Sequence, residues 1–464
     1  MEINKNIYII GIGGTLMSNA AVLLKDEGYN VWGSDNKLYP PTSDILKDAD
    51  IKVIEGFNKN NITDDIDIVL VGNIVSKGHD EMEEVLKKEI KYYSFPKFLE
   101  ENYLGNYKNL VVAGTHGKTT TTTMAIHIFE KLGLNPAYFV GAKLENKPSI
   151  KLTKKNSPFI IEGDEYDTAY FDKVPKFYHY KPLVAILTSV EFDHADIYKD
   201  IYELRTVFHN LIEMVPKNGL LVFWDGIVKV DSLGKNFNGN KVSYGFNPMS
   251  DIYCYSYAVR KGKMEISVKV FKKDMKFSLP MFGRHNVLNF LAVLGALSYY
   301  TDNFSKVQKA LDSFIPPKRR QEVILEKNGI IVIDDFAHHP TAIRETISAI
   351  KMRYPKNRLI TIFEPRSNTS RQKIFKDEYL EAFLQSSWVI IRKVEPHRLI
   401  PDENLLDVRE LLTELKSKNI RADFGKDGND ILSILKGRLR RGDIILIMSN
   451  GGFDNIYTNI ENIL

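Results

Sequence analysis

Cysteine is almost absent from this 464-residue sequence, because Cys254 is the only one. A single cysteine excludes an intrachain disulfide and a zinc site built from several thiolates. The sequence also lacks an apolar run approaching the ~18 residues of a membrane span, and its first residues have no apolar core of a signal peptide. We therefore expect a cytoplasmic protein that does not enter a membrane.

A strong charge of either sign is also missing. The formal net charge is +4, and no dense block of lysine and arginine with interleaved aromatic residues is present. We therefore expect no nucleic-acid partner. Hydrophobic residues make up 44% and charged residues 26% of the sequence, which is typical of a globular protein. The length suggests about three domains of roughly 150 residues, and we place them at residues 1–106, 107–313 and 314–464.

The most informative stretch lies at residues 110–121. Its apolar start predicts a buried strand, Gly114 and Gly117 break that strand, and a helix follows from Lys118. A glycine turn at a helix N-terminus directs backbone N–H groups and the helix dipole at a phosphate. The alternative is an ordinary strand–helix turn that carries a lysine. The pattern Gly-x-x-Gly-Lys-Thr is a shortened P-loop and predicts a nucleoside-triphosphate site formed by Gly114, Thr115, His116, Gly117, Lys118, Thr119 and Thr120.

A second glycine turn lies near the start of the chain. A predicted strand from Ile7 enters this turn, a helix runs out to Gly28, and a second strand ends at acidic Asp35. This resembles a dinucleotide fingerprint, but Leu16 stands where the third glycine belongs, so a dehydrogenase is not supported. The turn predicts a site for a nucleotide that carries a diphosphate, with candidate residues Gly11, Gly13, Gly14, Thr15, Ser34 and Asp35.

Two further predicted strands end in acidic or histidine residues. Glu162 follows an apolar run from Phe159, and His194 follows a run that ends at Ser189. Carboxylates and an imidazole at the same sheet edge as a P-loop suit Mg²⁺–ATP. The alternative, N-caps and surface loops, carries equal weight for the single residues Asp164, Asp167 and Asp196.

Later segments predict two more groups of polar side chains. Asn286 and Asn289 lie three residues apart on the first turn of a helix over 287–300, where two amides can meet a nucleobase or a phosphate. Residues 220–276 alternate and predict antiparallel sheet. In a third α/β domain, Arg366 and Asn368 follow a strand and can bind a carboxylate, although a salt bridge to a neighbouring helix is an alternative for Arg366.

Five motifs, in this order, resemble the Mur ligase family of peptidoglycan enzymes. They are Gly-Thr-His-Gly-Lys-Thr-Thr at 114–120, Glu-Gly-Asp-Glu at 162–165, Glu-Phe-Asp-His at 191–194, Gly-Arg-His-Asn-Val-Leu-Asn at 283–289 and Asp-Asp-Phe-Ala-His-His-Pro at 334–340. The resemblance covers nearly the whole chain. It implies an α/β protein of three domains, with Rossmann-like first and third domains and a central P-loop ATPase domain that holds a parallel sheet.

The resemblance also implies an ATP-dependent amide-bond-forming ligase that uses ATP and Mg²⁺. The first domain resembles the branch that takes UDP-N-acetylmuramate. Segments such as 39–43 and 364–369 resemble the member that recycles the tripeptide L-alanyl-γ-D-glutamyl-meso-diaminopimelate. Addition of L-alanine in cell-wall biosynthesis is the alternative reaction, and a non-catalytic UDP-sugar or peptide sensor is the alternative class. We expect only small-molecule partners, and a monomer or weak dimer.

Residue roles follow from the resemblance in the same way. Lys118 would steady the transferring phosphoryl group, Thr119 and Glu162 would hold one Mg²⁺, and His194 would bind a second. Asn289 would meet the adenine, with Asn286 beside it. The remaining roles concern the third domain: ATP contacts by Arg320 and Asp335, and recognition of the diaminopimelate end by Arg366 and Asn368.

The sequence departs from the family pattern at two positions. Ser189 stands where relatives usually have asparagine, and this is the one feature that favours the sensor. The neighbourhood of a carbamylated lysine in several relatives has no lysine here and contains His209 instead, which matches the muramate-adding branch.

Overall fold

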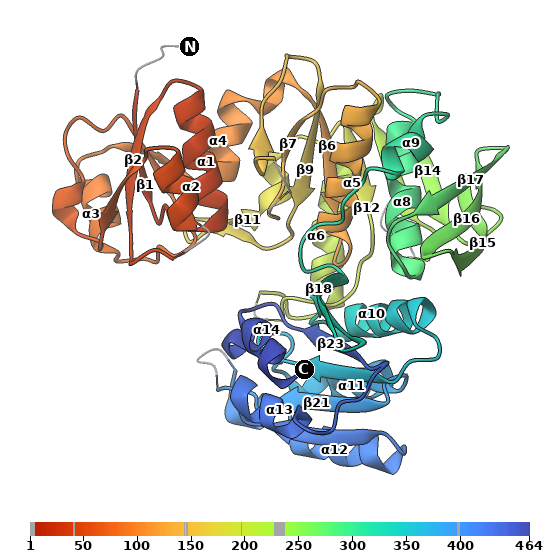
Figure 1. Cartoon of the computed structure of the whole chain (residues 1–464). Helices are drawn as coiled ribbons and strands as arrows, with labels where there is room; N and C mark the ends of the chain where they lie inside the picture. Colours follow the sequence, from red (N-terminus) through yellow and green to blue (C-terminus); the bar gives the residue numbers. More distant parts are fainter. Residues whose placement is uncertain are drawn as a thin grey trace.

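A computed structural model describes residues 5–39, 42–142, 144, 147–195, 197–226, 237–396 and 400–464. Three main β-sheets organise the chain in sequence order (Figure 1). The first two units lie beside each other and the third lies below them in this view. The predicted α/β class with three domains is confirmed, while the boundaries after residues 106 and 313 stay a prediction.

The first sheet is parallel, with strand order β3-β2-β1-β4-β5. Alternate residues of β1 face opposite sides, so Ile7 and Ile9 pack in one core, and Tyr8 and Ile10 pack in another. The elements are β1 (Asn6–Ile10), α1 (Thr15–Asp26), β2 (Asn30–Asp35), α2 (Thr42–Asp48), β3 (Lys52–Glu55), β4 (Ile68–Val71), α3 (Asp80–Lys87), β5 (Lys91–Tyr93) and α4 (Phe95–Asn102).

The central sheet has ten strands in the order β17-β16-β15-β14-β13-β12-β6-β9-β7-β8. Its strands are β6 (Lys108–Ala113), β7 (Ala137–Phe139), β8 (Ile150–Lys151), β9 (Pro158–Gly163), β12 (Val184–Leu187), β13 (Leu220–Trp224), β14 (Asn240–Gly245), β15 (Ile252–Arg260), β16 (Lys263–Val270) and β17 (Lys273–Leu279). The other elements are α5 (Lys118–Lys131), α6 (Ile201–Glu213), α8 (Arg284–Leu297), α9 (Val307–Leu311), and the hairpin of β10 (Asp167–Ala169) and β11 (Asp172–Pro175).

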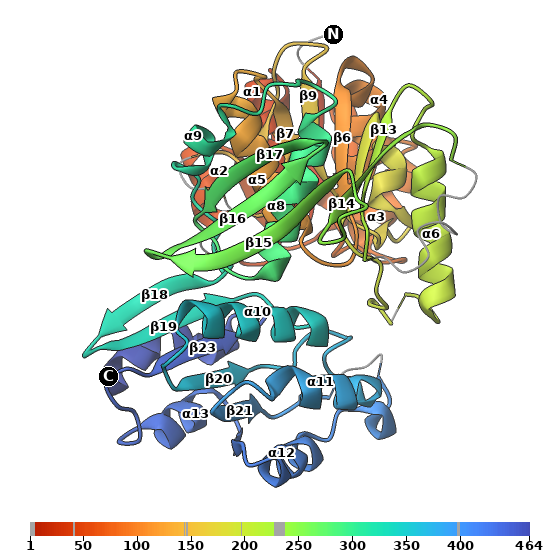
Figure 2. The same cartoon turned by 90° about the vertical axis from the view of Figure 1, so that its right-hand side faces the viewer.

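Two layers of helices cover the central sheet. Leu110 and Val112 share a core with α5 and α8, whereas Val111 and Ala113 share one with α6 and with the first domain. The expectation of antiparallel sheet over 220–276 is wrong for its first part, because β13 and β14 continue the parallel sheet. Among the described residues of this range, which exclude 227–236, the antiparallel pairs join β15 to β16 and β16 to β17. Figure 2 shows these three strands at one end of the sheet.

The third sheet has the order β18-β19-β23-β20-β21-β22, and only β18 is antiparallel to its neighbour. The helices α10 to α12 pack on one face, and α13 and α14 on the other. The elements are β18 (Glu322–Lys327), β19 (Ile330–Asp335), α10 (Pro340–Arg353), β20 (Leu359–Phe363), α11 (Lys376–Phe383), β21 (Trp388–Arg392), α12 (Val408–Ser417), β22 (Arg421–Gly425), α13 (Gly428–Leu435), β23 (Ile444–Met448) and α14 (Ile456–Asn459).

Thr42 and Ser43 begin α2, and a short 3₁₀ helix, Leu104–Asn106, precedes β6 with the side chain of Leu104 buried. Across the ranges that the structure describes, no helix is both long enough and apolar enough to span a bilayer.

Candidate active site

The predicted P-loop is a glycine turn between β6 and α5. Gly114 and Gly117 have φ values of +125° and +82°, which side chains rarely adopt. A Cβ atom at Gly114 would lie 2.2 Å from Thr188 Oγ1, and one at Gly117 would lie 2.4 Å from Asn289 Oδ1. Glycine is therefore required at both positions, and the turn brings the backbone of Lys118 to the start of the helix, where N–H groups are unpaired.

Lys118 is held in place by a buried carboxylate. Its Nζ lies 2.7 Å from Glu165 Oε2 and 2.9 Å from the carbonyl oxygen of Gly114. Burial alone would lower the pKa of Lys118, but the charges of Glu165 and Asp164 outweigh this effect and raise it. The lysine therefore carries its positive charge directly at the phosphate loop.

Glu162 and Thr119 meet beside this lysine. The Thr119 hydroxyl donates a 2.6 Å hydrogen bond to Glu162 Oε1, and the backbone N–H of Gly141 donates to Oε2 at 3.3 Å. Burial and the charge of Asp164 raise the pKa of Glu162. A carboxylate that is buried next to another carboxylate is stabilised by a nearby cation.

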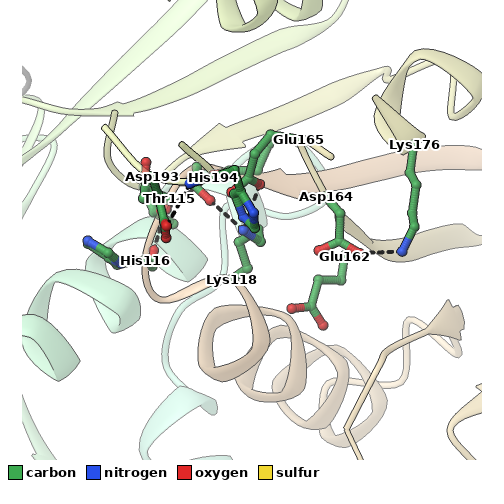
Figure 3. A network of polar contacts seen from close by, with 12 residues as sticks. Thr115, His116, Lys118, Glu162, Asp164, Glu165, Lys176, Asp193 and His194 are labelled. Atoms are coloured by element: carbon green, nitrogen blue, oxygen red, sulfur yellow. Dashed lines mark hydrogen bonds and ion pairs between the residues drawn. The ribbon is translucent and has the colours of Figure 1, made fainter. Parts of the chain in front are cut away.

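His194 reaches the same place from the loop after β12, as predicted. Its Nε2 lies 3.3 Å from Glu165 Oε1, a buried oxygen that has no hydrogen-bond partner. Figure 3 shows Lys118, Glu165 and His194 gathered at the start of α5. Burial lowers the pKa of His194, but Glu165 and Asp193 outweigh burial and raise it. Sequence reasoning did not assign a role to Glu165, although its motif was recognised.

The other acidic residues of this region differ in their surroundings. Asp164 accepts a 3.0 Å hydrogen bond from Lys176 Nζ, an ion pair that is also visible in Figure 3. Asp167 begins β10. Asp196 lies outside the described residues, so the prediction about it stays open.

A cavity of about 230 Å³ lies between the central and third domains. Asn286 and Asn289, both buried, come from the first turn of α8, and Asn289 Nδ2 donates to Asn286 Oδ1 at 3.2 Å. The structure brings seven of the predicted ATP-site residues to this cavity. The seven are His116, Gly117, Thr120, Asn286, Asn289, Arg320 and Asp335. The other four, Gly114, Thr115, Lys118 and Thr119, belong to the adjoining P-loop turn.

Asp335 and Arg320 form the third-domain side of the cavity. Asp335 accepts hydrogen bonds from the backbone N–H groups of Gln321 at 2.9 Å and Ala337 at 2.8 Å. Burial lowers the pKa of Arg320, while the charges of Asp335 and Glu162 oppose that effect. Asp335 thus fixes the loops that present Arg320 towards the central domain.

The glycine turn of the first domain is held by the end of β2. The N–H groups of Gly11 and Ile12 donate to Ser34 O at 2.9 and 3.1 Å, and Gly13 N donates to Asp35 Oδ2 at 2.7 Å. A Cβ at Gly13 would lie 2.1 Å from Leu38 Cδ2. Gly14 precedes α1, which begins at Thr15. The predicted residues of this site are therefore adjacent in space.

The Ser34 side chain, however, points into the core rather than towards the turn. Its hydroxyl donates a 2.6 Å hydrogen bond to Glu81 Oε2. Glu81 is fully buried and also accepts from Tyr8 Oη at 3.1 Å and Asn61 Nδ2 at 2.7 Å. Sequence reasoning missed Glu81, because a charged residue in the first turn of a helix is usually a solvated, dipole-stabilising residue.

Arg366 and Asn368 lie on the loop after β20. Arg366 is exposed, and its guanidinium packs over Gly451, where a Cβ would lie 2.5 Å from Nη1. Asn368 is half-buried and adjoins Thr369, whose hydroxyl donates to Asp193 Oδ1 at 2.5 Å. The loop therefore connects a surface arginine with the acidic segment of the central domain.

A second contact between these domains involves Glu191. The Thr341 hydroxyl donates to Glu191 Oε2 at 2.6 Å, and His116 Nε2 lies 3.5 Å from the same oxygen. Burial alone would raise the pKa of Glu191, but the interactions with His116 and Thr341 outweigh burial and lower this pKa to about 2. Burial and the charge of His116 lower the pKa of His339 to about 4.

The two departures from the family pattern have different environments. Ser189 is buried, its hydroxyl accepts the N–H of His116 at 3.0 Å, and its carbonyl oxygen accepts the N–H of Thr115. Ser189 therefore holds the P-loop turn through two hydrogen bonds, to the backbone N–H groups of Thr115 and His116. His209 is half-buried on α6.

Comparison with known proteins agrees with this arrangement. Family profiles match residues 6–107 as "Mur ligase family, catalytic domain", 112–297 as "Mur ligase middle domain" and 319–451 as "Mur ligase, glutamate ligase domain". The middle-domain match spans the phosphate loop and the acidic cluster, and the third match spans Arg320 and Asp335 on the other side of the cavity. The chain belongs to the Mur ligase family, whose members form amide bonds at the expense of ATP.

Individual relatives match nearly the whole chain. UDP-N-acetylmuramate–L-alanyl-gamma-D-glutamyl-meso-2,6-diaminoheptandioate ligase of Escherichia coli is 34% identical over 98% of this chain and 97% of its own. A UDP-N-acetylmuramate–L-alanine ligase of Clostridium kluyveri is 33% identical over 97% and 96%. The crystal structure of a murein peptide ligase from Psychrobacter arcticus matches with a TM-score of 0.73 and 31% identity, over 99% of this chain and 98% of that one.

Proposed function

We propose that this ligase joins L-alanyl-γ-D-glutamyl-meso-diaminopimelate to UDP-N-acetylmuramate in peptidoglycan recycling. The observation that carries the proposal is the end-to-end similarity to the Escherichia coli ligase of that name, 34% identical over 98% of the chain. The geometry supports it, because a phosphate loop and an interdomain cavity adjoin Lys118 and Glu162. ATP and UDP-sugars are cytoplasmic metabolites, so we propose the cytoplasm as its compartment.

The reaction proceeds through an acyl phosphate. The lactyl carboxylate of UDP-N-acetylmuramate attacks the γ-phosphorus of ATP, and ADP leaves with the electrons of the broken P–O bond. The amine of the tripeptide's L-alanine then attacks the acyl carbon, loses a proton and displaces phosphate. Because a carboxylate is a poor electrophile, phosphorylation supplies the leaving group, and the protein contributes positioning and charge neutralisation.

The residues present fit Mg²⁺. Thr119 and Glu162 offer a hydroxyl and a carboxylate 2.6 Å apart, and the buried Oε1 of Glu165 beside His194 has no hydrogen-bond partner. We infer that Thr119 and Glu162 hold one Mg²⁺ and that His194 holds a second. When bound, the ions neutralise charge on the phosphates and on the substrate carboxylate. Lys118 exchanges Glu165 for the transferring phosphoryl group.

The other substrates have separate places. We infer that the glycine turn from Gly11 to Thr15, fixed by Asp35, binds the UDP-sugar diphosphate. Asn286 and Asn289 meet the adenine, and Arg320, presented by Asp335, reaches ATP from the third domain. Arg366 and Asn368 receive the diaminopimelate end, where a guanidinium suits a carboxylate. We propose a monomer or weak dimer that acts on small molecules alone.

The decisive experiment measures phosphate release with ATP, Mg²⁺ and UDP-N-acetylmuramate, and compares the tripeptide with L-alanine as acceptor. Release that depends on the tripeptide, with little from L-alanine, supports the proposed reaction. The L-alanine reaction is the second candidate, since the Clostridium kluyveri relative of that name is 33% identical. The reverse acceptor preference would establish it. No release with either acceptor would favour a sensor.

A further inference from the structure

Three metal-ligating side chains converge at the junction of the central and third domains, outside the proposed Mg²⁺ residues. They are His116 in the P-loop, Glu191 in the loop after β12, and His339 at the start of α10. One possible ligand atom of each lies within 4.8 Å of the others. The two imidazole rings have centroids 4.6 Å apart. Two domains thus contribute to one cluster.

The imidazole of His116 has one nitrogen without a hydrogen-bond partner. His116 Nε2 is buried, has no hydrogen-bond partner, and lies 3.5 Å from Glu191 Oε2, beyond good hydrogen-bond distance. A buried polar atom without a partner is unfavourable and uncommon in folded proteins, so an ion would explain it. In a tetrahedral zinc site, ligand atoms are roughly 3.3 Å apart, which follows from bonds of about 2.0–2.1 Å. The separation of the two atoms fits this value.

The second imidazole is oriented as metal ligands usually are. His339 Nε2 lies 3.2 Å from the carbonyl oxygen of Phe192. Because a carbonyl oxygen can only accept a hydrogen bond, Nε2 must carry the proton. Its Nδ1 therefore carries the lone pair, which accepts a 3.3 Å hydrogen bond from the Thr341 N–H as the N-cap of α10 and would exchange this cap for the ion. A histidine whose other N–H donates to a backbone carbonyl has its tautomer and ring direction fixed for a metal.

We propose that His116, Glu191 and His339 form a binding site for one divalent transition-metal ion of the Zn²⁺ class. Two imidazoles and one carboxylate are typical of such ions, whereas Mg²⁺ prefers oxygen ligands. The ion ties the P-loop of the central domain to α10 of the third domain. It adds a bridge to the existing contact between Thr341 and Glu191, and it lies at the wall of the nucleotide cavity.

The proposed ion would also affect how the central and third domains are arranged. His116, Glu191 and Thr341 line the interdomain cavity, so an ion held there occupies space beside the phosphate loop. An ion that binds only when the two domains are together stabilises that arrangement in proportion to its concentration. The proposed ion therefore favours the arrangement in which the central and third domains are together.

The test uses the full-length protein stripped with a chelator and kept in excess Mg²⁺ without nucleotide. Co²⁺ is titrated and followed by its visible d–d absorption, and Zn²⁺ is titrated by calorimetry. We expect one equivalent to bind with the absorption of a nitrogen-containing, low-coordinate site. His339→Asn, which can still cap α10, and Glu191→Gln, which can still accept from Thr341, should each weaken binding by at least about tenfold.

His338→Ala is the matched control. His338 is adjacent in sequence, but its Nδ1 faces the carbonyl oxygen of Phe336 and it is outside the cluster, so this variant should keep the Co²⁺ spectrum. Unfolding curves show that each variant is folded. Equal binding by His339→Asn and wild type, no binding by wild type, or loss of binding only in His194→Ala would each overturn the proposal. The outcome does not depend on which acceptor the ligase uses.

Discussion

The ammonium of Lys118 lies 2.7 Å from Oε2 of Glu165, a side chain that is only 1% exposed. The other oxygen of Glu165 lies 3.3 Å from His194 Nε2. One buried carboxylate therefore orients both a phosphate-loop cation and an imidazole that comes from a different strand. This carboxylate is the counter-charge that stabilises a buried lysine.

Replacing Lys118 with alanine should abolish product formation but leave UDP-sugar binding unchanged. The lysine lies on the central domain, whereas the glycine turn around Gly13 belongs to another sheet. Phosphate release and calorimetry with UDP-N-acetylmuramate measure the two properties. Lys131→Ala, at the exposed end of the same helix, serves as the control. Undiminished turnover by Lys118→Ala would refute its assignment.

Glu165→Gln should lower kcat by roughly 10- to 100-fold, the range found when groups that orient metal ligands are lost. The glutamine keeps the shape but removes the charge that holds Lys118 and His194. Steady-state kinetics at several Mg²⁺ concentrations measure the effect, and Glu213→Gln, an exposed residue at the end of α6, is the control. A variant with wild-type kcat would mean that Glu165 is only a packing residue.

Motifs with a local geometric cause could be predicted from the sequence. The apolar run at 110–113, Gly114 and Gly117 define a strand, a turn and a helix start without help from the rest of the chain, and the structure has all three. The strands β13 and β14 could not be assigned in the same way. Alternation in sequence indicates one buried face, but whether a neighbour runs parallel depends on residues far away.

Contacts between distant segments were the other unpredictable part. Thr341 and Glu191 are 150 residues apart, and Thr369 and Asp193 are 176 apart, yet each pair is joined by a hydrogen bond across the domain junction. A threonine in a helix or loop carries no sequence signal for such a partner. The predicted roles of the site residues, including Arg366, also depend on bound substrates and stay predictions.

Glu81 should matter more to the first domain than its sequence context suggests. Glu81→Ala leaves the hydroxyls of Tyr8 and Ser34 without their buried acceptor, which costs about 2–4 kcal/mol of unfolding free energy. Because the carbonyl of Ser34 holds the glycine turn, KM for the UDP-sugar should rise while KM for ATP stays constant. Thermal unfolding and kinetics measure both effects. Glu83→Gln, exposed on the same helix, is the control, and parallel changes in the two KM values would contradict this role.

His339 predicts a pH dependence of stability. Its pKa is lowered from 6.5 to about 4, first by burial and then by the charge of His116, against the opposing charges of Asp193 and Glu191 and with a smaller repulsion from His338. A lowered pKa means that the unfolded chain takes up the proton first, so stability is lost as pH falls. The contribution is complete above pH 6.5 and disappears progressively towards pH 4, with a total of up to about 3 kcal/mol.

His339→Asn isolates this contribution, because asparagine can still cap α10 but does not titrate. Unfolding midpoints of the wild type and the variant are compared between pH 7.5 and 4 in the presence of a chelator, so that no metal ion contributes. The wild-type midpoint should fall relative to that of the variant as pH drops from 6.5 to 4. Glu191, with its pKa of about 2, stays ionised over this range and adds little to the difference. A constant difference between the two midpoints would show that His339 is protonated equally in the folded and unfolded chains.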